Sequence, residues 1–302
     1  MNEPLHNYMR VGLVHFMAYP KAMNDVGVFL STLEEIAADE FFGVVEVTGT
    51  WDQAVRERVE TLLQSSGLVA AYGAQPTILG GKLNPCSSDE AERVEAERVL
   101  LEELAAARTM GAGRLAILSG PDPGRESREP ALESLRRTVS ALCRRAAELD
   151  MLIVLETFDR EVDKRSLLGP SREAAEFAAT VKSDWPNFGV MIDLSHLPLL
   201  GETPAEAIAP LTGHLVHAHV GNCVSDPSDP AHGDSHPRFG YPGGDNDVAD
   251  LALFLRALLN YGYLDPSAKP IVSFEVKPLA GELPQAVIAG NKRALREAWA
   301  LV

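Results

Sequence analysis

The feature that most constrains the fold is a set of apolar segments that each end in a residue able to bind a metal ion. These segments end at Glu156, Asp193, His219 and Glu275. Buried parallel strands appear in a sequence as continuous Val, Ile and Leu runs. In a barrel of such strands, the functional side chains lie at the C-terminal ends. We therefore expect four strands that direct these side chains toward one end of a sheet.

Strand-like and helix-like segments alternate along the whole chain. Besides the four runs above, we expect strands at 9–16, 44–47, 68–72 and 115–118. Helical spacing of apolar residues follows the runs, as at Leu135, Val139, Leu142 and Ala146. Eight strand-then-helix units predict an α/β fold, a closed (β/α)₈ TIM barrel, with residues 1–302 forming a single domain. An open doubly wound sheet would need a glycine-rich phosphate loop after the first strand, and the sequence has none there.

Several helix starts and one long loop are predicted from local signals. Asn24 is expected to cap the first long helix, and a second helix is expected to open at 50–52. Ser87 and Glu90 have the spacing of a capping box. The Gly-, Pro- and Asp-rich segment at about 222–245 is expected to be a long loop over the site rather than a linker.

Composition excludes some classes of partner. The 302-residue chain has a formal net charge of −16, which argues against binding to nucleic acid, because that requires a basic surface. No apolar run reaches the roughly 18 residues that a membrane helix needs. The N-terminal segment has no secretory signal pattern, and the three cysteines are widely spaced, as in proteins of a reducing compartment. We expect a cytoplasmic protein with neither a nucleic acid nor a membrane partner.

The four strand-end residues have the chemistry of a site for one divalent metal ion. Mn²⁺, Mg²⁺ and Co²⁺ accept carboxylate oxygens together with an imidazole. Structural zinc usually brings cysteine or more histidine, so Mn²⁺ is favoured and Zn²⁺ is left open. A single Glu at a strand end is commonly a solvated or ion-paired terminus. The metal site is predicted because four successive strands end in this way.

In several short sequence motifs, the chain resembles the xylose-isomerase-like TIM barrel superfamily of sugar isomerases and epimerases. The resemblance spans nearly the whole sequence and is nearest to the ketose 3-epimerase and hydroxypyruvate isomerase branch. It is carried by Leu155-Glu156-Thr157-Phe158-Asp159, Asp193-Leu194-Ser195-His196, His217-Ala218-His219, Pro242-Gly243-Gly244-Asp245 and Glu275. The resemblance implies that one divalent metal is bound by Glu156, Asp193, His219 and Glu275.

The resemblance also implies an activity and catalytic roles. A metal that binds a carbonyl and the neighbouring hydroxyl acidifies an adjacent C–H and stabilises the enediolate that forms. Glu156 and Glu275 are then the acid/base pair, one on each face of a ketose or keto-sugar. His196 is implied to bind a substrate oxygen. Arg238, before a Pro-Gly turn, loosely matches an arginine that binds a hydroxyl or phosphate.

Other candidate residues come from the remaining strand ends and loops. His15, Glu46, Gln75 and Ser119 are expected near the sugar pocket. Glu46 is the strongest of these, because an inward charge in a Val-rich run is costly without a role, although a rim residue paired with a surface arginine is nearly as common. His217 is expected to be a buried core residue. The loop 232–238 contains two histidines and an aspartate. These residues could bind a second metal ion, but the commoner explanation is an exposed polar loop. Lys164 could either contact an anionic substrate or form an ion pair with Asp163.

Alternative functions remain open on the sequence alone. The same site suits a metal-dependent lyase, a decarboxylase or a deglycosylating subunit acting on a 3-oxo sugar. An abasic-site endonuclease shares the barrel but needs more histidine ligands and a basic face. A barrel that binds sugars without chemistry is disfavoured by the presence of both glutamates. Apolar helices leave open a homo-oligomer or a partner subunit.

Overall fold

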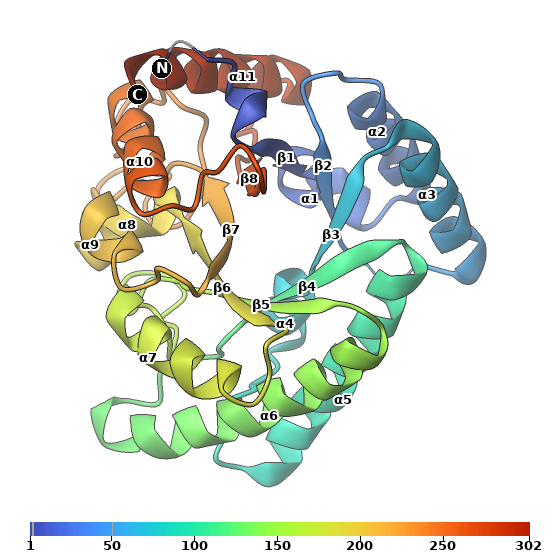
Figure 1. The fold of residues 1–302 in the computed structure, drawn as a ribbon, viewed down its shortest axis with the longest axis vertical. Helices are drawn as coiled ribbons and strands as arrows, with labels where there is room; N and C mark the ends of the chain where they lie inside the picture. The colour runs from blue at the N-terminus through green and yellow to red at the C-terminus, as the bar shows by residue number, and fades with distance from the viewer. Residues whose placement is uncertain (2, 50) are drawn as a thin grey trace.

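A computed structural model describes all residues except 2 and 50, and its centre is a closed barrel of parallel strands (Figure 1). The strands pair in chain order, and β8 closes on β1. They are β1 (Arg10–Val14), β2 (Val44–Val47), β3 (Val69–Gly73), β4 (Ala112–Leu118), β5 (Leu152–Glu156), β6 (Phe188–Asp193), β7 (Leu215–Val220) and β8 (Ile271–Phe274). The eight predicted strands and the single-domain (β/α)₈ fold are confirmed.

Helices surround the barrel, and their buried faces are apolar. The helices are α1 (His15–Ala18), α2 (Val26–Ala37), α3 (Gln53–Ser66), α4 (Gln75–Gly81), α5 (Glu90–Thr109), α6 (Arg128–Glu148), α7 (Ser171–Lys182), α8 (Leu197–Leu200), α9 (Pro204–Ile208), α10 (Val248–Asn260) and α11 (Pro284–Leu301). In α6 the predicted stripe Leu135, Val139, Leu142 and Ala146 is fully buried. The helical spacing therefore identified the face that covers the sheet.

Aspartates cap three of the helices that follow strands, and two predicted caps are wrong. Asp25, not Asn24, accepts a hydrogen bond from the backbone of α2. Asp89, not Ser87, caps α5 through the amides of Ala91 and Glu92. Asp52 caps α3, and Thr50, the first residue of the predicted start, lies outside the described residues. In the two corrected cases, the carboxylate directly before the first helical residue reaches the unpaired helix amides.

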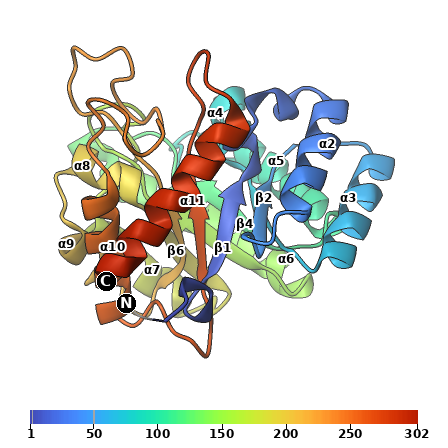
Figure 2. The ribbon, with the colours of Figure 1, turned by 90° about the horizontal axis from the view of Figure 1, so that it is seen from above.

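The two ends of the barrel differ. Figure 2 shows the 222–245 loop and the loop before α11 rising at one end, with the two chain termini together at the other. The Met1 ammonium donates a hydrogen bond to the Trp299 carbonyl at 3.1 Å, which closes the terminal end. In the described part of the chain, no helix is both long and apolar enough for a membrane span. The loop end is where the C-terminal ends of β5–β8 deliver their side chains.

Candidate metal centre

The four predicted ligand side chains converge at the loop end of the barrel. Glu156 and Asp193 are the last residues of β5 and β6, His219 is near the end of β7, and Glu275 directly follows β8. One ligand atom from each lies within 4.8 Å of those of the other three. His219 Nδ1 is 2.6 Å from Glu275 Oε2, 3.4 Å from Glu156 Oε1 and 4.0 Å from Asp193 Oδ2. The arrangement surrounds one point with three carboxylates and one imidazole.

This residue set fits a divalent cation. All four side chains are nearly or fully buried. Glu156 Oε1 and Asp193 Oδ2 are buried oxygens without a hydrogen-bond partner, although carboxylate oxygens in such surroundings are normally paired. Two unpaired anionic oxygens facing the same imidazole nitrogen are what a bound cation would satisfy. Glu156, Asp193, His219 and Glu275 thus form a group that could hold a metal ion.

Glu46 lies beneath the centre and orients His219. Its Oε1 accepts hydrogen bonds from Nε2 of His217 at 2.8 Å and from Nε2 of His219 at 3.0 Å. Burial alone would raise the pKa of Glu46, but His217 and His219 hold it well below its usual value. Because His219 Nε2 donates to Glu46, its Nδ1 is left to face the three carboxylates. Glu46 therefore supports a ligand from below and does not line the cavity.

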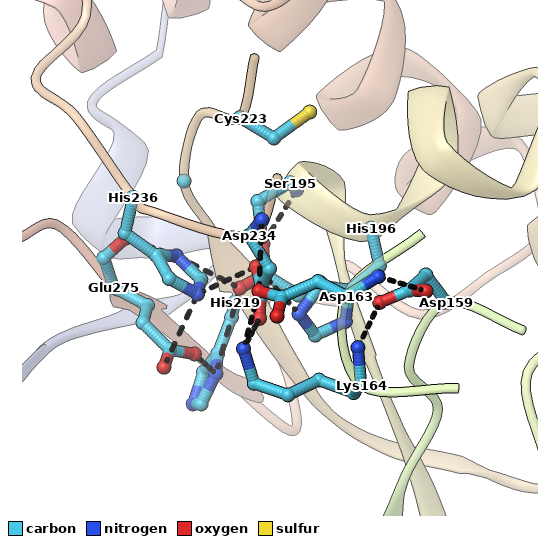
Figure 3. A network of polar contacts seen from close by, with 12 residues as sticks. Asp159, Asp163, Lys164, Ser195, His196, His219, Cys223, Asp234, His236 and Glu275 are labelled. Carbon is cyan, nitrogen blue, oxygen red and sulfur yellow. Dashed lines mark hydrogen bonds and ion pairs between the residues drawn. The ribbon is translucent and has the colours of Figure 1, made fainter. Parts of the chain in front are cut away.

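A second group of titratable side chains lies beside the first (Figure 3). Asp234 Oδ1 is 2.8 Å from His236 Nε2 and 3.2 Å from His196 Nε2. Its other oxygen is 3.1 Å from the Lys164 ammonium, which also contacts Asp163. Burial alone would lower the pKa of His196 and of His236, but the Asp234 carboxylate raises them to about 10 and about 9. The cluster strongly favours positive charge at the two imidazoles.

Within the long loop, the segment 232–238 was expected to be more commonly an exposed polar loop than a metal site, but part of it enters the site. Asp234 and His236 are buried, whereas His232 on the same loop is exposed. The close approach depends on Gly221, because a Cβ there would lie 2.6 Å from the Glu275 carbonyl and 3.1 Å from the His236 ring. In the sequence, the only signal for this placement is a carboxylate and a histidine two residues apart in the loop.

A cavity of about 510 Å³ opens above these groups. Its floor includes His219, His236 and Glu275, and Gln75 reaches it from α4. Gln75 Nε2 donates to Glu156 Oε2 at 2.7 Å, which fixes that carboxylate. The walls are largely apolar and include Phe16, Met17, Met23, Pro76, Leu79, Phe158, Pro230 and Leu279. The polar groups are therefore concentrated on one side of an otherwise apolar pocket.

Three residues expected near the pocket have other partners. His15 is buried outside the cavity lining and bonds Thr32 Oγ1 at 2.7 Å through Nε2. The Arg238 guanidinium is 2.9 Å from Glu282 and donates to the Gly240 carbonyl, also outside the lining. Ser119 accepts a hydrogen bond from the Leu168 amide. Lys164 does line the cavity, with its ammonium held between two aspartates.

Comparison with protein families agrees with this architecture. Residues 35–293 match the family model described as xylose isomerase-like TIM barrel. The chain belongs to that family. A comparison with proteins of curated function gives no match.

Solved structures with the same fold cover nearly the whole chain. A D-tagatose 3-epimerase-like protein aligns with a TM-score of 0.74 and 18% identity, covering 97% of this chain and 98% of that one. D-psicose 3-epimerase from Clostridium cellulolyticum H10 aligns with a TM-score of 0.66 and 17% identity, over 97% and 96% of the two chains. The IOLI protein, solved with a bound zinc atom, aligns with a TM-score of 0.68 and 15% identity, over 97% and 96%. At these identities the likeness establishes the shared fold.

Proposed function

We propose that this protein is a divalent-metal-dependent isomerase or epimerase of a ketose or keto-sugar derivative. The observation that carries the proposal is the convergence of Glu156, Asp193, His219 and Glu275 around one point, where His219 and Glu275 line the floor of the cavity. Two of its structural neighbours are described as 3-epimerases of ketoses, which agrees with this class of reaction. Mn²⁺ is the proposed metal, because three of the four ligands are carboxylates.

A divalent cation at this centre would polarise a substrate carbonyl and its neighbouring hydroxyl, and so would acidify the adjacent C–H. The chain's own groups then handle the proton. Glu156 and Glu275 come from strands separated by β6 and β7, and their ligand oxygens lie within 4.8 Å. One carboxylate removes the proton from the sugar carbon, and the other returns a proton from the opposite face.

Neighbouring residues hold these groups in place. Gln75 donates to Glu156 and leaves Glu156 Oε1 to face the centre. Glu46 fixes the His219 ring. His196 lies against the ring of Phe158, a residue of the cavity wall, with ring centroids 4.4 Å apart. The largely apolar walls surround the polar groups of the floor with few competing hydrogen-bonding groups.

The proposal is tested by following hydrogen exchange at the reacting carbon. The Mn²⁺-loaded protein is incubated in D₂O with a panel of ketoses, keto-sugars and 3-oxo glycosides. An epimerase incorporates deuterium at the carbon that is inverted, whereas an aldose–ketose isomerase incorporates it at the carbon that gains hydrogen. Mass spectrometry and NMR locate the label.

Matched variants assign the acid/base pair. Glu156→Gln and Glu275→Gln are each expected to lower turnover by about 10²–10⁴-fold, the range that general acid–base catalysis supplies. Exposed Glu95→Gln on α5 is the control and should exchange at the parental rate. Full activity in either site variant would remove that glutamate from the mechanism. Turnover without deuterium incorporation would reject proton-transfer chemistry.

A further inference from the structure

The cavity over the metal centre has two kinds of surface. His219, His236 and Glu275 contribute to a polar floor. The rest of the lining is largely apolar and comes from segments that follow β1, β3, β5, β7 and β8. A ligand that fills this space therefore needs one polar end and one apolar end.

Gly73 brings the two surfaces close together. A Cβ at this position would lie 2.9 Å from the Phe16 ring and 2.8 Å from the side-chain oxygen of Gln75. Because glycine has no Cβ, the ring and the amide that donates to Glu156 both approach the same point of the backbone. The apolar wall therefore begins close to the metal ligands.

Two side chains of the apolar wall are left partly uncovered. Met23 is 39% exposed and Leu79 is 45% exposed, although most large apolar side chains of the protein are buried. Both residues line the cavity. Exposed apolar side chains that gather at a concave site commonly mark a ligand-binding surface. An apolar group of a ligand would cover both of them.

The residue types of the wall favour an aromatic group. Phe16, Phe158 and Tyr241 line the cavity. The Tyr241 hydroxyl donates to Asp229 at 3.1 Å, so its hydrogen is already committed outside the ligand space. Aromatic rings pack favourably against one another in offset or edge-to-face geometry. Met23 adds a thioether, which contacts aromatic rings favourably and adapts to their shape.

The space is also larger than a single sugar needs. The cavity measures about 510 Å³. The twelve heavy atoms of a hexose would fill only about 360 Å³ even if each took the volume of a water molecule in the liquid, roughly 30 Å³. A second cavity of about 510 Å³ adjoins the first and shares Leu79 and Lys164 with it. A ligand can therefore extend past Leu79.

We propose that the substrate is an aryl glycoside of a keto-sugar, bound with its aromatic group against Met23 and Leu79. This assignment rests on the proposed function, because it places the keto-sugar over the metal ligands. A plain ketose is a poorer ligand for the same cavity. Any of its hydroxyls that turned toward the apolar wall would lose water and gain no hydrogen-bond partner.

Binding of a matched pair of glycosides tests this assignment without turnover. Phenyl and methyl β-D-glucopyranoside differ only in the aglycone, and neither has the ketone that the proposed reaction needs. Titration calorimetry with the Mn²⁺-loaded protein is expected to give the phenyl glycoside a Kd about 10- to 100-fold lower, the ratio that burial of an aromatic ring supplies.

A substitution on the wall locates the aromatic group. Leu79→Asn is expected to reduce the preference for the phenyl glycoside by about 5- to 10-fold, because part of the apolar contact is lost. Val94→Asn on α5 is the matched control, since Val94 is 46% exposed and lies outside the cavity lining. Circular dichroism of both variants checks the fold. An unchanged preference in a folded Leu79→Asn protein would overturn the placement.

Deuterium exchange separates this inference from the proposed function. The phenyl and methyl glycosides of 3-oxo-D-glucose are incubated with the Mn²⁺-loaded protein in D₂O. A kcat/KM for exchange about 10- to 100-fold higher for the phenyl compound would support both. Exchange in both compounds, with equal Kd for the two glucopyranosides, would overturn the aromatic site and leave the proposed reaction. Tighter binding of the phenyl glucopyranoside, with no exchange in either 3-oxo compound or in any ketose, would overturn the reaction and keep the aromatic site.

Discussion

The two halves of the barrel contribute to the site in different ways. The ends of β5–β8 supply the converging Glu156, Asp193, His219 and Glu275, of which His219 and Glu275 line the floor of the cavity. The segments that follow β1 and β3 supply mainly apolar walls, such as Phe16, Met17 and Leu79. Glu46 of β2 is turned inward to support His219. One barrel thus carries ionisable groups on one half and a largely apolar wall on the other.

This asymmetry separates two effects: the strand position brings a side chain to the mouth of the barrel, and the residue type decides whether that side chain is ionisable. The C-terminal ends of all eight strands meet at the same end of the barrel, so any of them can place a side chain there. The second half places several ionisable groups where they face one another, and Glu46 is the group from β2 that meets them from below. Metal removal and substitutions in each half test how far this division between ionisable groups and apolar wall holds.

The largest expected effect is from metal removal, which acts on the β5–β8 half alone. Dialysis against chelator should lower turnover by at least about 10³-fold, because the polarising ion supplies several kcal/mol of charge stabilisation. Activity is then measured after adding back Mn²⁺, Mg²⁺, Co²⁺ or Zn²⁺, with Mn²⁺ expected to restore it best. Undiminished activity in the metal-free protein would contradict the role of the centre.

The second largest effect is expected from substitution of Gln75, a polar residue of the first half that contacts Glu156. Gln75→Leu removes the donor to Glu156 and should lower kcat by about 10- to 100-fold, since hydrogen bonds to charged groups contribute about 1.5–3 kcal/mol. Gln53→Leu removes a similar bond, to Glu57 on the exposed face of α3, and is the control. Equal kinetics for the two variants would show that Glu156 needs no support from the first half.

A moderate effect on stability is expected at His15. Burial lowers its pKa from 6.5 to about 4, so the unfolded chain takes up a proton in this range before the folded protein does. The free energy of unfolding should therefore decrease as the pH falls from 6.5 to 4, with His15 contributing up to about 3 kcal/mol. Urea unfolding at several pH values measures this.

The His15→Gln variant isolates that contribution. It should lose about 0.5–1.5 kcal/mol of stability at pH 7, because the Thr32 hydroxyl loses one of its hydrogen bonds, and it should show a weaker pH dependence below 6.5. Its kcat/KM should stay nearly unchanged, since His15 does not line the cavity. A large fall in kcat/KM at full stability would instead place His15 in the site.

The smallest effect is expected at Arg238, whose partner lies outside the cavity. Arg238→Ala should change stability by less than about 1 kcal/mol, as for other partly exposed ion pairs. KM should match that of the parental protein. A marked rise in KM would show that Arg238 leaves Glu282 to bind substrate.

Much of the architecture was predictable from the sequence because strands and helices have different apolar periods. All eight strands, and the buried face of α6, follow from continuous runs and from helical spacing. Cap positions were less predictable, since Asn24 and Asp25, or Ser87 and Asp89, are similar candidates in sequence. Which of them reaches the helix amides depends on the local backbone path.

The site was predictable where a strand ends in a ligand and less so where a loop folds back. Glu156, Asp193, His219 and Glu275 could be grouped because parallel strands place their ends together. Asp234 and His236 follow no strand, and their burial depends on Gly221 and on pairing with His196 and Lys164. No periodicity in the sequence reports such contacts between distant segments.

The sequence by itself determined the barrel and the four strand-end residues of the first centre, because both follow from short-range patterns. The tertiary structure alone decided that Glu46 supports His219, that Arg238 pairs with Glu282, and that His236 enters the pocket. These placements depend on distances between segments far apart in the chain. A side chain's partner is set by the packing of the loops that carry it.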